Sequence, residues 1–392
     1  MNKDKHIPQG YKESPLGIIP KEWEVKRLGE VCNISIGRDV QMDHFSEFVI
    51  DNYNYPVYSN TIEEKGLYGY YNYEEYTKGK VTVVGRGVGL GTSFARDNGF
   101  GAIGRLVVLT PKENLSNHYL ESYINNKVHF FVESAAIPQL TGEQIASYKI
   151  AIPSLPEQKE IEKYIQLWDT AIEKQSELIE KLKLRKRALM QQLLTGKKRL
   201  PGFSGEWKEV KLGDVFDERN ETNRDDLPLL SITGEKGVIY QSDSDKRDIS
   251  NDDKTKYKRI CPNDIGYNTM RMWQGRSALS ELEGIVSPAY TIVTPRENVN
   301  VKFMAILIQQ PRVVYDFWTH SQGLVSDTLN CKYPDFCQVK VRIPTKQEQT
   351  AIASVLVQAD KEIELAKEQL ANLQSQKRGL MQQLLTGKKR II

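Results

Sequence analysis

The run LMQQLLTGKKR occurs twice in this chain of 392 residues, at Leu189–Arg199 and at Leu380–Arg390. The repeat extends upstream, because IPSLPEQKEIEKYIQLWDTAIE from Ile152 aligns without a gap with IPTKQEQTAIASVLVQADKEIE from Ile343, 191 residues later. A repeat at a fixed offset indicates a tandem duplication. The chain is therefore expected to contain two similar halves, each ending in a helical segment of the same length.

Both repeats predict a long helix with one apolar seam, because apolar residues alternate at four and three positions, as in a coiled coil. Pro156 stands before the first predicted helix and Gly196 after it, and Thr345 and Gly387 take these places at the second helix. From Glu157 to Thr195 the first helix would be about 60 Å long. One lysine interrupts each seam at the same place. The seam positions are Ile161, Ile165, Trp168, Ile172, Gln175, Ile179, Leu182, Lys186, Leu189 and Leu193 in the first helix and Ile352, Leu356, Ala359, Ile363, Ala366, Leu370, Leu373, Lys377, Leu380 and Leu384 in the second.

A lone helix of this length needs a partner to cover its apolar seam, and the other copy in the same chain is the nearest candidate. If the first helix leads from the first globular domain to the second, an antiparallel second helix carries the chain back to the first domain. We therefore expect a circular, pseudo-two-fold arrangement with the two domains in opposite orientations. The alternative is a coiled coil between two chains, but equal helix lengths within one chain favour the internal pair.

The globular parts repeat at a different offset. EWEVKRLGEV from Glu22 matches EWKEVKLGDV from Glu206, and LTPKEN from Leu109 matches VTPREN from Val293, both 184 residues apart, so the second part holds seven extra residues between Pro311 and Arg342. Short β-type runs with turn signals surround one helical stretch in each part, near 117–132 and 301–317. The predicted fold class is α+β, with two similar mixed α/β globular domains joined by two long antiparallel coiled-coil helices. The predicted boundaries are 1–21 for an N-terminal arm, 22–152 for the first domain, 153–199 for a central helical spacer, 200–343 for the second domain and 344–392 for a C-terminal helical spacer.

Composition excludes several classes of protein. The chain has 54 basic and 51 acidic residues, so net charge alone does not indicate nucleic-acid binding. Four cysteines without a CxxC pair and five scattered histidines do not fit a zinc site, and we expect reduced thiols in a cytoplasmic protein. No signal peptide opens the chain, and no apolar run approaches the roughly 20 residues of a membrane span. We expect a soluble intracellular protein that binds no membrane and no metal.

Catalytic motifs are also missing from the sequence. Base-flipping adenine methyltransferases use an Asn or Asp followed by Pro-Pro and an aromatic residue, and this tetrad does not occur. A GxxxxGK[ST] phosphate loop does not occur either. Gly85, Gly87, Gly89 and Gly91 follow a β-type run, but their spacing does not match a dinucleotide fingerprint. We therefore expect no catalytic residue in this chain.

The remaining candidates are polar, aromatic and basic residues in loops, which suit DNA binding. Arginine can bind guanine with two hydrogen bonds, asparagine or glutamine can do the same for adenine, and lysines and hydroxyl groups bind phosphates. Equivalent turns in the two halves differ most where readers of different sequences ought to differ. For any single residue, a solvated loop position or a half-buried tyrosine is the simpler interpretation. The candidate DNA-binding residues are Tyr58, Ser59, Asn60, Tyr68, Tyr70, Tyr71, Tyr73, Lys78, Arg86, Ser93, Arg96 and Arg105 in the first domain and Arg219, Asn220, Arg224, Ser231, Thr233, Lys256, Tyr257, Lys258, Asn268, Arg271, Trp273, Gln274, Arg276 and Ser277 in the second.

Four sequence marks together make the chain resemble the specificity subunit of type I restriction-modification systems. They are the opening YKESPLGIIPKEWEVKRLGEV, the IPSLPEQ entry to the first helix with its variant IPTKQEQ at the second, the closing LMQQLLTGKKR, and the LPGFSGEWKEVKLGDV that opens the second domain. The resemblance covers nearly the whole chain. Lys346 and Gln347 depart from the usual form of the helix entry.

The resemblance implies that residues 22–152 and 200–343 are target-recognition domains, each reading one half of a bipartite asymmetric site in double-stranded DNA. It implies that the helical regions act as a spacer. It also implies two methyltransferase subunits that bring S-adenosylmethionine, and restriction/translocase subunits that use ATP and magnesium, with no cofactor in this chain. A rival interpretation is a coiled-coil scaffold that binds proteins without recognising DNA.

Overall fold

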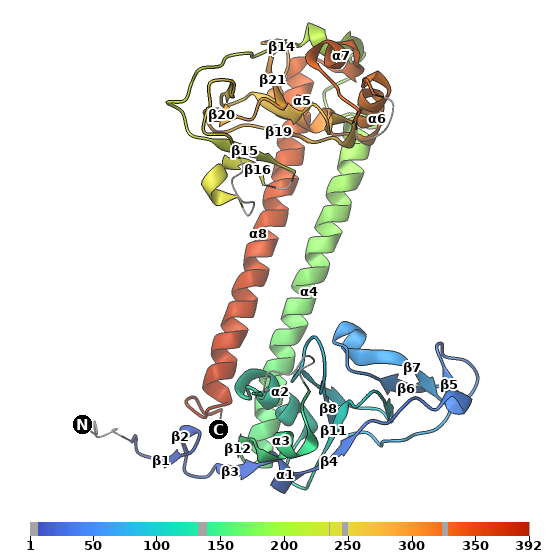
Figure 1. Ribbon diagram of the computed structural model, residues 1–392, viewed down its shortest axis with the longest axis vertical. Coiled ribbons are helices and arrows are strands. Elements are labelled where there is room, and N and C mark those ends of the chain that lie inside the picture. The colour runs from blue at the N-terminus through green and yellow to red at the C-terminus, as the bar shows by residue number, and fades with distance from the viewer. Residues whose placement is uncertain (1–6, 132–138, 235, 245–249, 324–327, 392) are drawn as a thin grey trace. The chain divides into compact units, whose positions relative to one another are not determined.

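The computed structural model describes residues 7–131, 139–234, 236–244, 250–323 and 328–391 (Figure 1). The chain divides into two compact units: unit 1 comprises Met1–Glu177 and Glu368–Ile392, and unit 2 comprises Leu178–Lys367. Two long helices, α4 (Leu155–Leu193) and α8 (Lys346–Leu384), each contribute one portion to each unit. Both helices have 39 residues, so the predicted equality of their lengths is confirmed.

Unit 1 is built on a four-stranded antiparallel sheet in the order β4-β11-β8-β9, with α2 packed against it. A second four-stranded sheet, β10-β6-β7-β5, forms an outer lobe, and β3 pairs with β12 beside the start of α4. The elements are β1 (Tyr11–Ser14), β2 (Gly17–Pro20), β3 (Glu24–Arg27), α1 (Leu28–Val31), β4 (Cys32–Ile36), β5 (Phe45–Ser46), β6 (Tyr55–Tyr58), β7 (Leu67–Tyr71), β8 (Lys80–Val83), β9 (Ser93–Arg96), β10 (Gly101–Ala102), β11 (Val107–Pro111), α2 (Asn117–Lys127), α3 (Gly142–Ser147) and β12 (Lys149–Ile152).

Unit 2 repeats this plan with the sheet β14-β21-β18-β19 and the pair β13-β22, while β15-β16 and β17-β20 form its outer lobe. The elements are β13 (Lys208–Lys211), β14 (Phe216–Glu218), β15 (Leu230–Thr233), β16 (Gly237–Tyr240), β17 (Lys258–Ile260), β18 (Ile265–Asn268), the short 3-10 helix η5 (Met272–Gln274), β19 (Ser277–Leu279), β20 (Gly284–Val286), β21 (Tyr290–Pro295), α5 (Val301–Leu307), α6 (Pro311–His320), α7 (Tyr333–Gln338) and β22 (Lys340–Ile343).

The helix predicted near 301–317 is wrong as a single element, because it is broken between α5 and α6. Gln310 has an extended backbone and Pro311 is the first residue of α6. Proline disfavours a helical conformation in the residue before it, yet it is well suited to the first turn of a new helix. The same reasoning applies to Pro156, which lies in the first turn of α4 instead of before it. The helix predicted near 117–132 ends at Lys127.

The seams of α4 and α8 are covered as predicted, because every seam position is buried or half-buried. In unit 1 Asp169 pairs with Lys377, and in unit 2 Lys186 pairs with Asp360 at 2.5 Å. Within each unit, residues further along α4 bond to residues earlier in α8, so the two helices run antiparallel. The seam lysines are therefore neutralised by aspartates at equivalent places in the duplication.

Each unit completes its core with the end of the helix that starts in the other unit. In unit 1, Ile161 near the start of α4 and Leu384 at the end of α8 are buried in one cluster with Trp23. In unit 2, the equivalent residues Ile352, Leu193 and Trp207 are buried together. Because both ends of the chain lie in unit 1, the tail after α8 meets the N-terminal arm, where the Tyr11 hydroxyl donates to the carbonyl oxygen of Gly387 at 2.8 Å. The predicted circular course of the chain is confirmed by this contact.

A buried glutamate and an arginine fix each helix end. Arg390 donates from Nε and Nη2 to Glu157 at 2.6 and 3.0 Å, and Arg199 donates from the same atoms to Glu348, both at 2.6 Å. Both carboxylates are almost fully buried. Hydrogen bonds to these carboxylates raise the pKa of Arg199 and Arg390 above the usual value, so both arginines stay charged at neutral pH.

In the described part of the chain, none of the helices has the length and apolar character that a membrane crossing requires. This finding is separate from the packing of α4 and α8, whose outer faces carry many charged residues.

The two tryptophans provide a matched test of these helix-end contacts. Trp23 Nε1 donates to Glu157 Oε2 at 3.0 Å, whereas the buried Trp207 Nε1 finds no acceptor among the described residues. Replacing either indole by phenylalanine leaves a similar gap, but only Trp23→Phe removes a hydrogen bond to a buried charge. We expect Trp23→Phe to lower the free energy of unfolding by about 1.5–3 kcal/mol more than Trp207→Phe, as for hydrogen bonds to charged groups. Denaturant titration followed by circular dichroism measures both, and equal losses would contradict the role of Trp23.

Candidate nucleic-acid interface

The loop between β8 and β9, residues 84–92, is the glycine-rich turn of unit 1. Gly87, Gly89 and Gly91 have φ values of 86°, 87° and 89°, which residues other than glycine rarely adopt. The backbone N–H of Ser93 donates to Asn125 Oδ1 at 2.8 Å, and Asn125 Nδ2 donates to the Ser93 carbonyl at 2.9 Å. The predicted reader Ser93 is therefore a buried anchor that ties the end of this loop to α2.

The equivalent loop of unit 2, residues 269–276, joins β18 to β19 and has the same anchors. Ser277 is buried, and its carbonyl oxygen accepts from Gln309 Nε2 at 2.8 Å, where Gln309 is the equivalent of Asn125. Gly275 has a φ of 73° at the place equivalent to Gly91. In both units an amide side chain thus donates to the carbonyl of the serine, but the Ser277 N–H donates to the Gly275 carbonyl at 2.9 Å and not to the amide. Ser277 is, like Ser93, an anchor.

The exposed parts of these two loops differ. The loop of unit 1 exposes Arg86 and the side chain of Val88, which is 86% exposed. In unit 2, the buried side chain of Met272 holds η5 against the core, and Arg271, Gln274 and Arg276 are exposed. Common anchors with different exposed side chains are what two readers of different sequences require.

Asn60 connects the glycine-rich turn of unit 1 with two neighbouring segments. Its Oδ1 accepts from the N–H of Gly85 at 2.8 Å, and its Nδ2 donates to the carbonyl of Gly104. The next residue, Arg105, is exposed and has a φ of 67°. Ser59 is half-buried and its N–H donates to the carbonyl of Gly66 at 2.8 Å. Asn60 is therefore a brace that brings the exposed Arg86 and Arg105 onto adjacent loops.

Arg96 and Tyr58 pack together inside unit 1. The guanidinium carbon of Arg96 lies 3.4 Å from the centroid of the Tyr58 ring. Its Nε donates to Thr82 Oγ1 at 2.9 Å, and its Nη2 donates to the Lys65 carbonyl at 2.7 Å. Burial lowers the pKa of Arg96 to about 10. The guanidinium of Arg96 thus already contacts Tyr58, Thr82 and the Lys65 carbonyl within unit 1. Its contact with DNA stays a prediction, which this packing does not favour.

The predicted tyrosines of the outer lobe differ in burial. Tyr71 is buried, and its ring stacks on Tyr73 with centroids 5.1 Å apart. Tyr68 is 54% exposed and packs on Phe45, while Tyr70 is half-buried. Lys78 is exposed in the turn before β8. Of this cluster, Tyr68 and Lys78 are the side chains placed to meet a ligand.

An open cavity of about 670 Å³ lies beside the loop of unit 2, under the β15-β16 hairpin. Its wall includes six of the predicted readers, which are Thr233, Asn268, Arg271, Gln274, Arg276 and Ser277. The Arg276 guanidinium lies against Gly234, where an added Cβ would come within 2.2 Å of Nη1. Lys236 and Tyr290 also line the cavity and were not predicted, because the folding of the hairpin over β18 depends on contacts that are distant in sequence.

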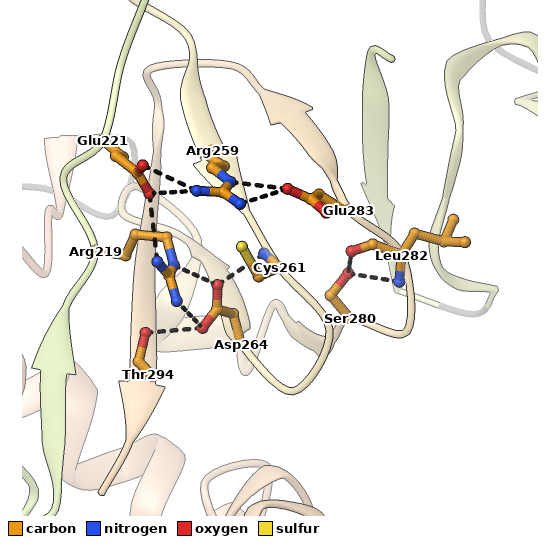
Figure 2. Close-up of polar contacts among 9 residues, drawn as sticks. All are labelled: Arg219, Glu221, Arg259, Cys261, Asp264, Ser280, Leu282, Glu283 and Thr294. Carbon is orange, nitrogen blue, oxygen red and sulfur yellow. Dashed lines mark hydrogen bonds and ion pairs between the residues drawn. The ribbon is translucent and has the colours of Figure 1, made fainter. Parts of the chain in front are cut away.

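Among the other predicted readers of unit 2, Arg219 is held within the fold by a carboxylate network (Figure 2). Arg219 Nε donates to the buried Asp264 at 2.7 Å, and Thr294 Oγ1 donates to the same carboxylate at 2.7 Å. The hydrogen bond to Asp264 raises the pKa of Arg219. Glu221 accepts hydrogen bonds from both Arg219 and Arg259, and the bond from Arg259 is the main cause that lowers the pKa of Glu221. Arg219 is therefore placed to brace the outer lobe.

Further predicted residues of unit 2 fall into two groups. Arg224 pairs with Asp226 at 2.7 Å, Lys258 lies 3.8 Å from Glu218, and Tyr257 is buried. Trp273 Nε1 donates to the Met270 carbonyl at 3.0 Å and so stabilises the loop. In contrast, Asn220 and Lys256 are exposed, and Ser231 is half-buried on β15.

Across the described residues, groups of three or more His, Cys, Asp or Glu side chains arranged for a metal ion do not occur. The exposed Arg86, Arg271, Gln274 and Arg276 side chains of the two loops supply hydrogen-bond donors and, from the arginines, positive charge, which suits base edges and phosphates.

Comparisons with known proteins agree with this architecture. The family described as "Type I restriction modification DNA specificity domain" matches residues 20–184 and again 204–375. A putative type I restriction enzyme MjaX specificity subunit from Methanocaldococcus jannaschii is 22% identical, with 98% of this chain and 97% of that protein covered. The S subunit of a type I restriction-modification system from M. genitalium has a similar fold, with a TM-score of 0.57, 12% identity and coverage of 98% of this chain and 99% of that one.

A chain from a structure on complex assembly and conformational transition of the type I R-M system is also similar in fold, with a TM-score of 0.59 and 16% identity over 95% of this chain and 99% of that one. The family match covers most of the sequence and occurs once in each half, as the duplication predicts. This chain therefore belongs to the family of type I restriction-modification DNA specificity proteins.

Proposed function

We propose that this protein is the sequence-specific DNA-binding subunit of a type I restriction-modification complex. Each unit reads one half of a bipartite asymmetric site in double-stranded DNA, unit 1 with residues 84–92 and unit 2 with residues 269–276. The chain positions two adenine methyltransferase subunits and the restriction/translocase subunits in the cytoplasm. It performs no chemistry itself, because S-adenosylmethionine, ATP and magnesium are bound by those partners.

The observation that carries the proposal is the pair of equivalent loops. Asn125 donates to the Ser93 carbonyl and Gln309 to the Ser277 carbonyl, so the two loops share an anchor, whereas their exposed residues are different. A scaffold that bound only proteins would have no need for equivalent loops with different exposed donors. Family membership supports the same function, and the relatives named above are specificity subunits of type I systems.

In unit 2, hydrogen bonds within the loop leave its long side chains available for DNA. The N–H groups of Gln274 and Arg276 both donate to the Arg271 carbonyl, and the N–H of Gly275 donates to the Met272 carbonyl. The loop backbone is thus ordered before binding, which reduces the entropy lost on forming a complex. Arg271 and Arg276 suit guanine, and Gln274 suits adenine, in the major groove.

The helices α4 and α8 are proposed to fix the number of unread base pairs between the half-sites. Each has 39 residues, or about 58 Å at 1.5 Å per residue. Every seam position of both helices is buried or half-buried, so a change in the length of one helix requires the same change in the other. A span of this length corresponds to at most roughly 17 base pairs at 3.4 Å each.

The rival function is a scaffold that binds proteins without recognising DNA. A gel-shift experiment with this chain and its methyltransferase subunit on random DNA separates the two. Retarded DNA whose affinity depends on sequence supports the proposal, and a protein complex that never binds DNA supports the scaffold.

Arg276→Ala tests base reading in unit 2. We expect the substitution to relax the sequence preference at one base pair of one half-site, with a loss of about 1–3 kcal/mol for the preferred base. Gly234→Ala should have a similar effect without unfolding the protein, because the new Cβ displaces the Arg276 guanidinium, the mobile end of a flexible side chain. Selection of bound sequences from randomised DNA measures the preference.

The control for this experiment is Lys256→Ala, which removes an exposed positive charge outside the cavity. It should weaken binding to all sequences alike and reduce the slope of log affinity against log salt by at most about one. If Arg276→Ala gave the same uniform loss, the assignment of Arg276 to a base would be wrong.

Removing one heptad from each helix tests the proposed spacer. Residues 174–180 and 365–371 are equivalent in the duplication, and deleting both keeps the seam in phase. The helices then shorten by about 10 Å, so the unread spacer should lose roughly three base pairs. Selected binding sites give the spacer length. A folded variant that still selects the original number of unread base pairs would contradict the proposed role of the helices. Deletion from α4 alone should impair folding, because the seams of the two helices would no longer match.

A further inference from the structure

The outer lobe of unit 1 carries an exposed apolar group on the segment between β4 and β6. Met42, Phe48, Val49 and Ile50, which we call the apolar tip, are 67%, 72%, 61% and 52% exposed. Large hydrophobic side chains are individually common on surfaces, but three in succession at this exposure mark an interaction site more often than a solvated loop. Neither the reading loops nor the helix seams include these residues.

The apolar tip is held in an ordered conformation. The Ser46 hydroxyl donates to the Phe48 carbonyl at 2.7 Å and accepts from the Phe48 N–H at 3.2 Å. A second turn follows, in which the Tyr53 N–H donates to the Ile50 carbonyl at 2.7 Å. Strand β5 lies at the edge of its sheet (Figure 1). Its residue Phe45 packs edge-on against the buried Tyr71, with ring centroids 6.3 Å apart. The tip is therefore presented outward by fixed turns, which lowers the entropy lost when a partner covers it.

Four carboxylates accompany the apolar tip. Asp39, Asp43, Glu47 and Asp51 are exposed, and none of them forms an ion pair with another residue in the described parts of the chain. Only one cation, Arg38, lies in the stretch from 38 to 51, apart from His44. A surface of this charge repels DNA phosphates and attracts a protein surface rich in lysine or arginine. The charge contrasts with that of the reading loops, whose exposed tips carry arginines.

We infer that the apolar tip docks into an apolar pocket, rimmed by lysine and arginine, on a methyltransferase subunit. The inference rests on the proposed function for the identity of the partner, whereas the charge and exposure of the tip select a basic protein over DNA. Phe48 and Ile50 supply the buried contact, and the carboxylates steer and orient the partner. The tip thereby gives unit 1 a contact with the enzyme that is separate from the residues that read DNA.

The test compares Phe48→Ser combined with Ile50→Ser against Phe131→Ser. Phe131 is an equally large side chain of unit 1, 80% exposed, and lies outside the tip. With purified methyltransferase subunit as the probe, we expect affinity to fall at least tenfold for the tip variant and to stay unchanged for Phe131→Ser. In the presence of saturating methyltransferase, DNA affinity should be the same for both. Circular dichroism verifies that the variants are folded.

The charge component has its own variant, Asp43→Asn with Glu47→Gln, which keeps the shape of the tip. Wild-type association with the methyltransferase should slow as salt increases, and this variant should associate more slowly at low salt with a smaller salt dependence. Unchanged methyltransferase affinity in the apolar variant would overturn the inference. It would also be overturned if that variant lost DNA affinity instead, or if the wild type self-associated through the tip in sedimentation experiments.

Failure of the proposed function can be told apart from failure of this inference. One outcome is that the wild-type chain with methyltransferase binds no DNA, while the tip variant binds methyltransferase more weakly than the wild type does. The proposed DNA recognition would then be wrong, and the docking surface would stand. The other outcome is that DNA binding is sequence-specific and the tip substitutions change neither DNA affinity nor methyltransferase affinity. In that case only the inference about the tip would fail.

Discussion

Burial of the two helix seams is the constraint on which the rest of the structure depends. A 39-residue helix with one apolar stripe is not stable alone in water, and here each stripe is covered by the equivalent stripe of the other copy. The helix ends then enter the cores of both units, where Glu157 and Glu348 are buried and neutralised by Arg390 and Arg199. A buried carboxylate without its arginine would be costly, so these pairs also fix the register of the helices.

The loops of residues 84–92 and 269–276 show how one scaffold can present two different surfaces. The serine anchors and the left-handed glycines are fixed by the sheet and by α2 or the turn after α5, so the exposed residues between them can change without loss of the fold. Arg271 and Gln274 extend from a loop that contains η5, while Arg86 extends from a glycine-rich loop, and both loop backbones are internally hydrogen-bonded. Variation is confined to places where it costs little stability.

The sequence predicted the helices well and the individual site residues less well, for one physical reason. Heptad spacing and duplication are local or repeated signals, so the seam and the antiparallel pairing could be inferred from the chain alone. The roles of Arg96, Arg219 and Ser93 depend on Thr82, Asp264 and Asn125, which reach them only through the tertiary fold. A polar residue in a loop looks the same in sequence whether it braces the loop or faces solvent. In contrast, local proline rules could have predicted both the break before Pro311 and the place of Pro156 in the first turn of α4.

The central claim is that one chain reads two separate half-sites and directs adenine methylation there. Sequencing that detects methylated adenine, in cells given this gene and its methyltransferase gene, tests the claim most directly. The account predicts that all added methylation falls within one asymmetric sequence made of two specific parts separated by a constant number of unspecified base pairs. Methylation at a single uninterrupted motif, or at two parts with variable separation, would contradict it.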